Sequence, residues 1–437
     1  EYFTLFVDET TSVGMKSIAN VYVMFDDGNN VAEHYLGIVN MNLKLGLTAN
    51  HFYNAIVELC REKGISLTNC VFSEMDGCAT NQGRFRGLKL YFCYHNGHHI
   101  SESCLSHKFA LLPQHLVVES SFEPLEEADK LALGLAAFFK ASPLRTAVFE
   151  NAQLVLNNKV LKLIAPSATR WLTHGQCFSR ILDLFINTLA TLNSLYTDKD
   201  DFKAFGFMLG MINPGFQLSC LALQDVFSVM RLLTHWLQKS PQNAEITLVP
   251  ILVKKTVDQL LDLAGDVTKK ASLSDGDLQG LKFTYLEFEK LSSEVDEFVK
   301  NIPAASYTRR RNAYASADKK AVYDDFFDEI FKPFAREMAN SIENSLEINS
   351  TCKAFTCLDC RSLSKSNDLQ SFCEDDLNEL IDWYGKPRKG EYPVAMDNME
   401  VAPSDPKINP TETRLEFETY KCCIVNLKAK FDKEIRR

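Results

Sequence analysis

Phe3-Thr4-Leu5-Phe6-Val7-Asp8-Glu9-Thr10 is an apolar strand pattern that leads directly into two acids. A second stretch, Phe72-Ser73-Glu74-Met75-Asp76-Gly77, repeats this arrangement. A carboxylate at the end of a buried strand is held rigidly and faces a cleft, which suits an oxygen ligand of a divalent metal. Asp8 and Asp76 are therefore candidate metal ligands. Strands also end in polar turns without any metal, so spacing alone leaves that simpler interpretation open.

The first part of the chain predicts three strands, a helix and a fourth strand. The three strand patterns, with the turn Asp26-Asp27-Gly28 between the last two, are Phe3–Val7, Ile18–Phe25 and His34–Val39. Three successive strands predict an antiparallel meander. A helix should follow over about residues 49 to 63 and end at Gly64, because its apolar residues share one face. The fourth strand is expected at Cys70–Ser73.

From about Glu126 onward the pattern becomes helical and predicts an all-α body. The stretch Leu131–Phe139, flanked by two lysines, is expected to be a buried helix. Two more helices follow from helical spacing over residues 281 to 298 and 322 to 342, the latter with a kink expected at Pro333. The segment from Gly385 to Pro410 contains five prolines and is the best linker candidate.

Composition bounds the possible classes of protein. At 437 residues, with 46% hydrophobic and 24% charged residues, the chain should form two packed units or one core with a large insertion. No uninterrupted run of about 18 apolar residues occurs, so we expect no membrane-spanning helix. Thirteen cysteines without a repeating framework favour reduced thiols in the cytosol or nucleus. The net charge of -10 argues against a nucleic-acid partner unless local basic patches bind it.

Four motifs, in this order, resemble those of hAT-superfamily DNA transposases. Asp8 in Leu5–Ser12 resembles the first catalytic aspartate, and Asp76-Gly77, with Gly83 and Arg84–Leu88 after it, resembles the second. Cys104-Leu105-Ser106-His107, followed by Lys108–Leu111, is similar to the Cys-x-x-His segment of the family. Thr169-Arg170-Trp171-Leu172 resembles the Thr-Arg-Trp motif that begins the family's helical insertion.

The resemblance implies a fold of the α/β (α+β) class, with an RNase H-like mixed-sheet domain interrupted by a large all-α insertion. We expect the first part of the catalytic core over residues 1 to 120, the helical insertion over 121 to 400, and a return to the core over 401 to 437. Family members carry an N-terminal BED-type zinc finger and a C-terminal dimerisation region. The sequence is expected to be a fragment that lacks the zinc finger and most of the dimerisation region.

A third acid should follow the insertion. Glu416 in Arg414–Tyr420 is similar to the Glu-Leu-x-x-Tyr segment of the family, with Glu412 and Glu418 as rival candidates. Asp8, Asp76 and Glu416 would hold two Mg²⁺ (or Mn²⁺) ions for phosphodiester hydrolysis and transesterification. A glutamate on an amphipathic helix is also commonly only a solvated side chain.

Other residues of these motifs receive expected roles in DNA binding. The resemblance implies that Trp171 stacks on a displaced base, that Arg170 holds phosphate and that His107 contacts phosphate at the rim of the site. A tryptophan in a helical domain is often only a core residue, and Cys104 is assigned to packing. A second, zinc-binding interpretation concerns four cysteines in a polar stretch, Cys352, Cys357, Cys360 and Cys373, whose spacing is irregular.

Three classes of function stay open at this stage. The first is a DDE-type transposase, expected in the nucleus with DNA as its partner, no membrane association, and a homo-oligomer formed through the C-terminal region absent here. The second is a domesticated, catalytically inactive relative that binds DNA or protein. The third is a non-catalytic helical scaffold. The presence of Asp8 and Asp76 favours the first class, whereas the unusual third segment and the acidic net charge favour the second.

Overall fold

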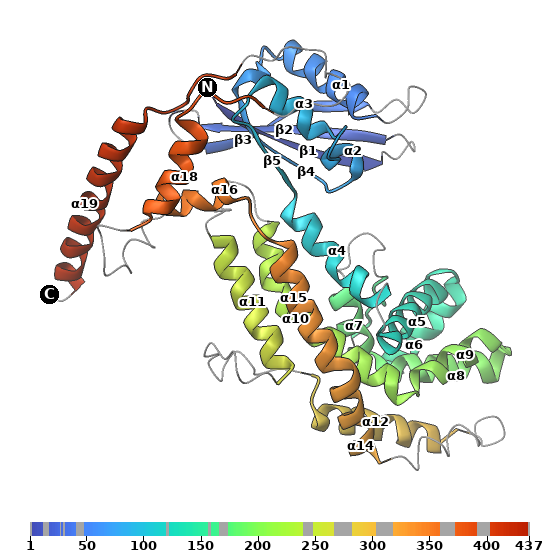
Figure 1. Ribbon diagram of the computed structural model, residues 1–437. Helices are drawn as coiled ribbons and strands as arrows, with labels where there is room; N and C mark the ends of the chain where they lie inside the picture. The colour runs from blue at the N-terminus through green and yellow to red at the C-terminus, as the bar shows by residue number, and fades with distance from the viewer. Residues whose placement is uncertain are drawn as a thin grey trace. The chain divides into compact units, whose positions relative to one another are not determined.

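The computed structural model of the chain describes most of its residues (Figure 1). The described residues are 2–11, 17–26, 28, 31–40, 48–118, 122–155, 159–165, 174–238, 248–265, 282–302, 318–358, 372–390 and 403–435. They fold into a mixed α/β protein with a five-stranded sheet and many helices. The chain divides into two compact units: residues 1–108, 238–251 and 346–437 form the first, and residues 109–237 and 252–345 form the second.

The sheet of the first unit has the strand order β3-β2-β1-β4-β5. Its strands are β1 (Phe3–Thr11), β2 (Ser17–Asp26), β3 (Val31–Asn40), β4 (Cys70–Met75) and β5 (Ile100–Ser103). β2 is antiparallel to both β1 and β3, while β4 is parallel to β1 and β5 is parallel to β4. The predicted antiparallel meander and the fourth strand are confirmed. β5 was not predicted from the sequence, because it is only four residues long and mostly polar.

One face of the sheet packs against α1 (Ala49–Glu62) and α3 (Leu88–His95). Alternate residues of β1, including Leu5 and Val7, are buried in this core with Ile56 of α1 and Phe92 of α3. This alternation follows from the two-residue repeat of a strand. The predicted helix is confirmed, and Gly64 follows it with a left-handed φ of 71°.

The second unit is helical. α10 (Pro214–Leu237) contacts several neighbouring helices, and its buried residues make it the centre of the unit. Its companions are α5 (Glu123–Lys140), α6 (Pro143–Val155), α7 (His174–Asp183), α8 (Phe185–Lys199), α9 (Phe202–Met211), α12 (Tyr285–Lys300), α14 (Lys319–Phe326) and α15 (Lys332–Ser345). α4 (Leu105–Val118) and α11 (Val249–Leu263) span the unit boundaries. The predicted helix around Leu131–Phe139 lies within α5 and contributes buried residues.

The long helical pattern over residues 322 to 342 contains a π-helical turn, and the kink expected at Pro333 stays a prediction. A π-helical turn, Phe327–Phe331, separates α14 from α15 and lies immediately before Lys332 and Pro333. A proline lacks the N–H that an α-helix needs and displaces the preceding turn. Leu281, at the start of the other predicted helix, lies outside the described residues.

The unit boundaries differ from the expected domain boundaries. The sheet unit covers residues up to Lys108, residues 238–251 and residues from Leu346 onward, whereas the sequence suggested boundaries at 120 and 400. The difference at the second boundary arises from α16 (Ser350–Ala354), a short 3-10 turn (Phe355–Leu358) and α18 (Glu374–Tyr384). These pack with α19 (Pro410–Ile435) in a small apolar cluster that includes Cys357, Leu380 and Phe417.

Among the described helices, α10 is long and apolar enough to cross a membrane by length and composition, and 72% of the residues in its apolar window are buried inside the structure. α5 and α6 would pass the same test only as one span, and they are bent by 104°. A buried central helix of a folded unit meets these criteria equally well. The absence of a membrane-spanning segment therefore remains a prediction.

The C-terminal part of the first unit is clamped to the turn between α3 and β5. Gly97 N donates to Ser404 Oγ at 2.8 Å, and His98 Nε2 lies 2.9 Å from the carbonyl oxygen of Lys386. Trp383 Nε1 donates to the His98 carbonyl oxygen at 3.1 Å. A Cβ added to Gly97 would overlap the carbonyl oxygen of Arg388, so only glycine permits this approach.

We predict that Gly97→Ala releases this clamp. The added methyl group would force the backbone at Arg388 away, at a cost of about 1 to 3 kcal/mol in the free energy of unfolding. Arg388 and Ser404 exchange backbone hydrogen bonds of 3.0 and 2.8 Å, so both amides should exchange hydrogen for deuterium faster in the variant. Mass spectrometry after deuterium labelling measures this directly.

Gly206→Ala is the matched control, because nothing lies within 4 Å of the Cβ that it adds inside α9. It should stabilise the protein slightly, by about 0.5 to 1 kcal/mol. If the amides of Arg388 and Ser404 exchange at the same rate in Gly97→Ala as in the native protein, the backbone contact between Gly97 and Arg388 does not hold this segment in place.

Candidate functional site

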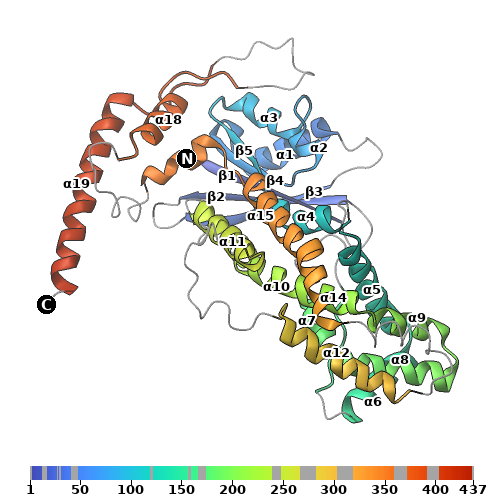
Figure 2. The same cartoon turned by 60° about the horizontal axis from the view of Figure 1, so that its bottom comes forward.

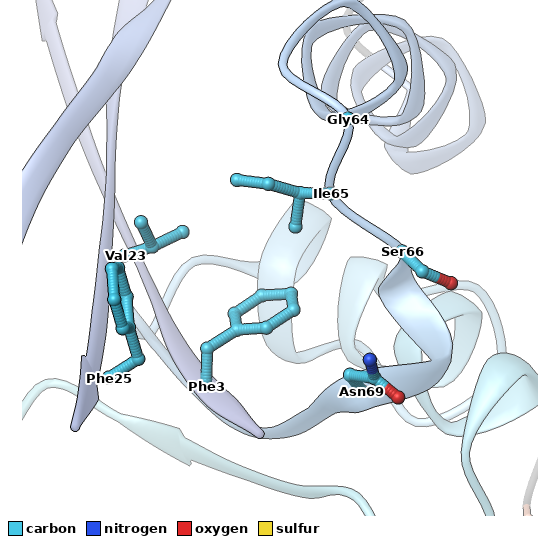
Figure 3. Close-up of a pocket in the computed structure, with 7 residues that line it drawn as sticks. All are labelled: Phe3, Val23, Phe25, Gly64, Ile65, Ser66 and Asn69. Atoms are coloured by element: carbon cyan, nitrogen blue, oxygen red, sulfur yellow. The ribbon is translucent and has the colours of Figure 1, made fainter. Parts of the chain in front are cut away.

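The best-formed hollow in the described structure lies away from the acids. It measures about 250 Å³ and is lined by Phe3, Val23, Phe25, Gly64, Ile65, Ser66 and Asn69. Figure 3 shows the Phe3 ring beside Ile65, at the start of β1. The lining offers no titratable side chain, and Glu9 lies at the opposite end of the same strand. The hollow therefore lacks the titratable side chains that a catalytic site needs.

The acids gather where β1 and β4 end. The two strands are parallel and neighbours, with Val7 paired to Met75 as the last pair of their register. The next positions are Asp8 and Asp76. The expectation that these aspartates lie on neighbouring strands is confirmed, while a short separation of their carboxylates stays a prediction. The carboxyl ends of parallel strands meet at one edge of a sheet, which brings side chains distant in sequence together.

The described cluster at this edge is built from Glu9, Asp76 and Cys78. Their potential ligand atoms all lie within 4.8 Å of one another, and they are the only such group of histidine, cysteine and acidic side chains among the described residues. Asn81 joins two of them, because its Nδ2 donates to Glu9 Oε1 at 2.8 Å and to Asp76 Oδ1 at 2.7 Å. Thus an amide bridges a carboxylate of the sheet and a carboxylate of the following turn.

Glu9 was not among the residues chosen from the sequence. Leu5 and Val7 point into the core, so the two-residue repeat of the strand places Glu9 on that face and Asp8 on the other. Asp8 is exposed. The signal that could have identified Glu9 was therefore present in the strand pattern, but the motif resemblance drew attention to its neighbour.

Asn81 is positioned by the short helix α2 (Ala79–Gln82), which follows β4 after a turn. The Asp76 carboxylate caps this turn by accepting from the backbone N–H of Cys78 at 3.2 Å. Glycines fix the exit from α2: a Cβ on Gly87 would overlap backbone atoms of Gly83 and the Asn81 carbonyl oxygen. Asn81 is fully buried as a result.

The pKa values of the Glu9 and Asp76 carboxyl groups are shifted in opposite directions. Burial, followed by the charges of Asp76 and Asp8, raises the pKa of Glu9 despite its hydrogen bond with Asn81. Burial also acts to raise the pKa of Asp76, but hydrogen bonds from Cys78 and Asn81 and the nearby charge of His107 outweigh it, so the pKa of Asp76 is lowered. Asp76 is thus held ionised beside a carboxyl that ionises less readily.

The cluster fits a hard divalent cation. The Asn81 Oδ1 atom is buried and has no hydrogen-bond partner among the described residues, while the Nδ2 atom of the same amide faces the two carboxylates and donates to both. Burial, and then hydrogen bonding to Asp76, raises the pKa of Cys78 to about 11, which keeps its thiol protonated at neutral pH. The carboxylate oxygens of Glu9 and Asp76 are therefore the atoms suited to hold an ion.

The third-acid candidates lie on α19 as expected for a helix, and Glu412, Glu416 and Glu418 are all exposed. α19 packs through Phe417 against the cluster of α16 and α18. Glu418 forms an ion pair of 2.6 Å with Lys421. Among the described contacts none joins these glutamates to Asp8 or Asp76, so the role of Glu416 stays a prediction.

The remaining motif residues divide into described and undescribed ones. His107 lies at the start of α4, where its charge acts on Asp76, in keeping with the expected rim position. Cys104 is half-buried beside Glu74, which together with burial raises the pKa of its thiol to about 12. Arg170 and Trp171 lie outside the described residues, as does Cys360. Cys357 belongs to the apolar cluster of α18 and α19, with Cys373 packed against it.

No known protein-family model matches the chain.

We predict that Asn81→Ala destabilises the protein in the presence of a chelator by about 2 to 3 kcal/mol, because two hydrogen bonds to carboxylates are lost. The same change should weaken Mn²⁺ binding about 10- to 100-fold, as loss of a residue that orients or joins the ligands usually does. Denaturant titration and calorimetry measure the two effects.

Asn54→Ala, an exposed change on α1, serves as the control and should alter stability by less than about 0.5 kcal/mol. If Asn81→Ala and Asn54→Ala have the same stability and the same Mn²⁺ affinity, the Asn81 amide does not hold the two carboxylates in position.

Proposed function

We propose that the chain is the catalytic region of a DNA-cleaving and strand-transferring enzyme of the hAT transposase type, with a metal-dependent site at the ends of β1 and β4. The observation that carries the proposal is the parallel pairing of these strands, which ends at Val7 and Met75 and brings Glu9 close to Asp76. The motif resemblance supplies the class of reaction. Mg²⁺ (or Mn²⁺), DNA as partner, a nuclear location and self-association through a further C-terminal region belong to the same proposal.

The architecture supports an RNase H-like assignment. A mixed sheet in the order β3-β2-β1-β4-β5, with only β2 running against the others, suits such a domain because it sets the first and fourth strands side by side. The helical unit of residues 109–237 and 252–345 interrupts the sequence of the sheet unit, as an insertion would.

The residues of the site have complementary tasks. Divalent ions, when bound, lower the pKa of an attacking water and stabilise the leaving 3′ oxygen of an in-line displacement. Asp76 and Glu9 supply anionic oxygens, and Asn81 fixes the separation of the two carboxylates. His107 brings a donor near Asp76, where a phosphate oxygen would lie.

The second candidate is a domesticated relative that binds DNA or protein without cleaving it. The packing of α19 favours it, since Phe417 and Tyr420 attach that helix to the α18 cluster and leave Glu416 exposed. Three acids usually share the ions in the reaction that the resemblance implies, so a site limited to the ends of β1 and β4 would bind metal but cleave poorly.

We predict that Asp76→Asn abolishes Mg²⁺-dependent DNA cleavage. DNA affinity should change little or improve, because a negative charge near phosphate is removed together with a metal ligand. A nicking assay on a labelled duplex and a binding titration in chelator separate the two quantities. Retained cleavage in this variant would rule out the proposed mechanism.

A paired comparison decides which acid of β1 holds the metal. The geometry indicates that Glu9 is the metal ligand, so Glu9→Gln should weaken Mn²⁺ binding at least about tenfold. Asp8→Asn should weaken it less, because this change removes only a nearby negative charge. The resemblance indicates Asp8 and predicts the opposite ranking. Glu62→Gln, an exposed change on α1, is the control, and calorimetric titration provides the affinities.

A further inference from the structure

The turn from Gly83 to Gly87, between α2 and α3, presents an unusual surface. Phe85 is 63% exposed, and Arg84 and Arg86 on either side of it are exposed as well. An exposed phenylalanine between two arginines offers a flat apolar ring and two positive charges within three residues. Such a combination suits a ligand that carries both a ring system and anionic groups.

Neither arginine is neutralised by an acid in the part of the chain that the structure describes. Neither forms an ion pair or a hydrogen bond with another residue of the described chain, although the Arg84 guanidinium lies 5.4 Å from the centre of the Phe85 ring. An arginine that stabilises a fold is normally paired or hydrogen-bonded. In a chain of net charge -10, two unpaired arginines next to each other form a local basic patch of the kind that phosphate binding requires.

The turn is rigid at its base. Gly83 N donates to the Ala79 carbonyl oxygen at 3.0 Å, and Gly87 N donates to the Gly83 carbonyl oxygen at 2.9 Å. Side chains at either glycine would overlap neighbouring backbone, so the closed form of the turn depends on both. The three exposed side chains therefore project from a preorganised support, which lowers the entropic cost of binding.

The turn also lies next to the acid cluster. Gly87 packs against the carbonyl oxygen of Asn81, the residue whose amide contacts both Glu9 and Asp76. The base of the turn is therefore in contact with the residue that holds the two carboxylates. The acids by themselves would repel phosphate, so a neighbouring positive element is required to bring a strand to them.

We propose that the Gly83–Gly87 turn binds the DNA strand at the site, with Arg84 and Arg86 on phosphates and Phe85 stacked on an unpaired base. The proposal rests on the proposed function, because it assigns the turn to the substrate of that site. Stacking on an open ring requires a base that is not already stacked in a duplex, so the preferred ligand is a single-stranded segment of DNA.

The test uses the full chain and a fluorescein-labelled oligothymidylate of about 20 nucleotides, with anisotropy measured in chelator at several salt concentrations. Each phosphate contact on a single strand contributes about 0.7 to the slope of log affinity against log salt. Replacing both Arg84 and Arg86 by alanine should therefore lower the slope by about 1.4. Phe85→Ala should weaken binding about tenfold while leaving the slope unchanged.

Matched controls use the same residue types elsewhere. Arg61→Ala removes an exposed arginine that is paired with Glu58, and Phe202→Ala removes a phenylalanine that is 71% exposed on α9. Neither should change affinity or slope. Thermal unfolding checks that every variant is folded, and Arg84→Lys with Arg86→Lys should keep the slope, since both charges remain.

The outcomes separate this proposal from the proposed function. If the native chain cleaves DNA with Mg²⁺ but the alanine variants bind like the controls, the turn is not the strand-binding element and the enzyme assignment stands. If binding depends on the turn but no cleavage occurs with Mg²⁺, the turn assignment stands and the enzyme assignment falls. Absence of DNA binding by the native chain overturns the turn assignment.

Discussion

The parallel pairing of β1 with β4 is the constraint on which the site depends. Parallel strands cannot be joined by a tight turn, so the chain must cross over between them, and β2, β3 and α1 occupy that crossover. The pairing fixes Val7 opposite Met75 and thereby brings the acids that follow each strand to one edge. Without it, Glu9 and Asp76 would be distant carboxylates, and the described group of possible metal ligands would not form.

Negative charge is concentrated at that edge of the sheet, and nearby hydrogen-bond donors offset part of it. The Asn81 amide donates to both carboxylates, and the Cys78 thiol stays protonated and can donate to them as well. The result is asymmetric, because the pKa of Asp76 is lowered while that of Glu9 is raised. A site with one firmly ionised carboxylate and a second that ionises at some cost is stabilised by a cation, since the ion relieves the repulsion that burial strengthens.

The sequence predicted the parts of this arrangement that depend on local pattern. Alternating apolar residues identified β1 to β3, and helical spacing with Gly64 identified α1, because burial of one face imposes those repeats. β5 and α2 are too short for any repeat to show, and both border the site. Glu9 was missed because motif matching compares only the type and order of residues. The face of the sheet on which a side chain lies is instead decided by its position in the strand. Asn81 holds Glu9 and Asp76 through tertiary contacts, and such contacts cannot be predicted from a local sequence pattern.

The C-terminal segment returns to the sheet through a clamp and not through a long interface. Gly97 permits the backbone of Arg388 to lie against the turn before β5, and Trp383 and Lys386 bond to His98 in the same turn. α19 follows this clamp and is attached by Phe417 to α18. Polar contacts hold the described part of this helix as well, because Tyr420 Oη donates to the Leu358 carbonyl oxygen and Arg414 Nη2 donates to Asn378 Oδ1. Glu416 is exposed on this helix, and no described contact joins it to Glu9 or Asp76, so a third acid at the site is the feature that separates a cleaving enzyme from a protein that only binds.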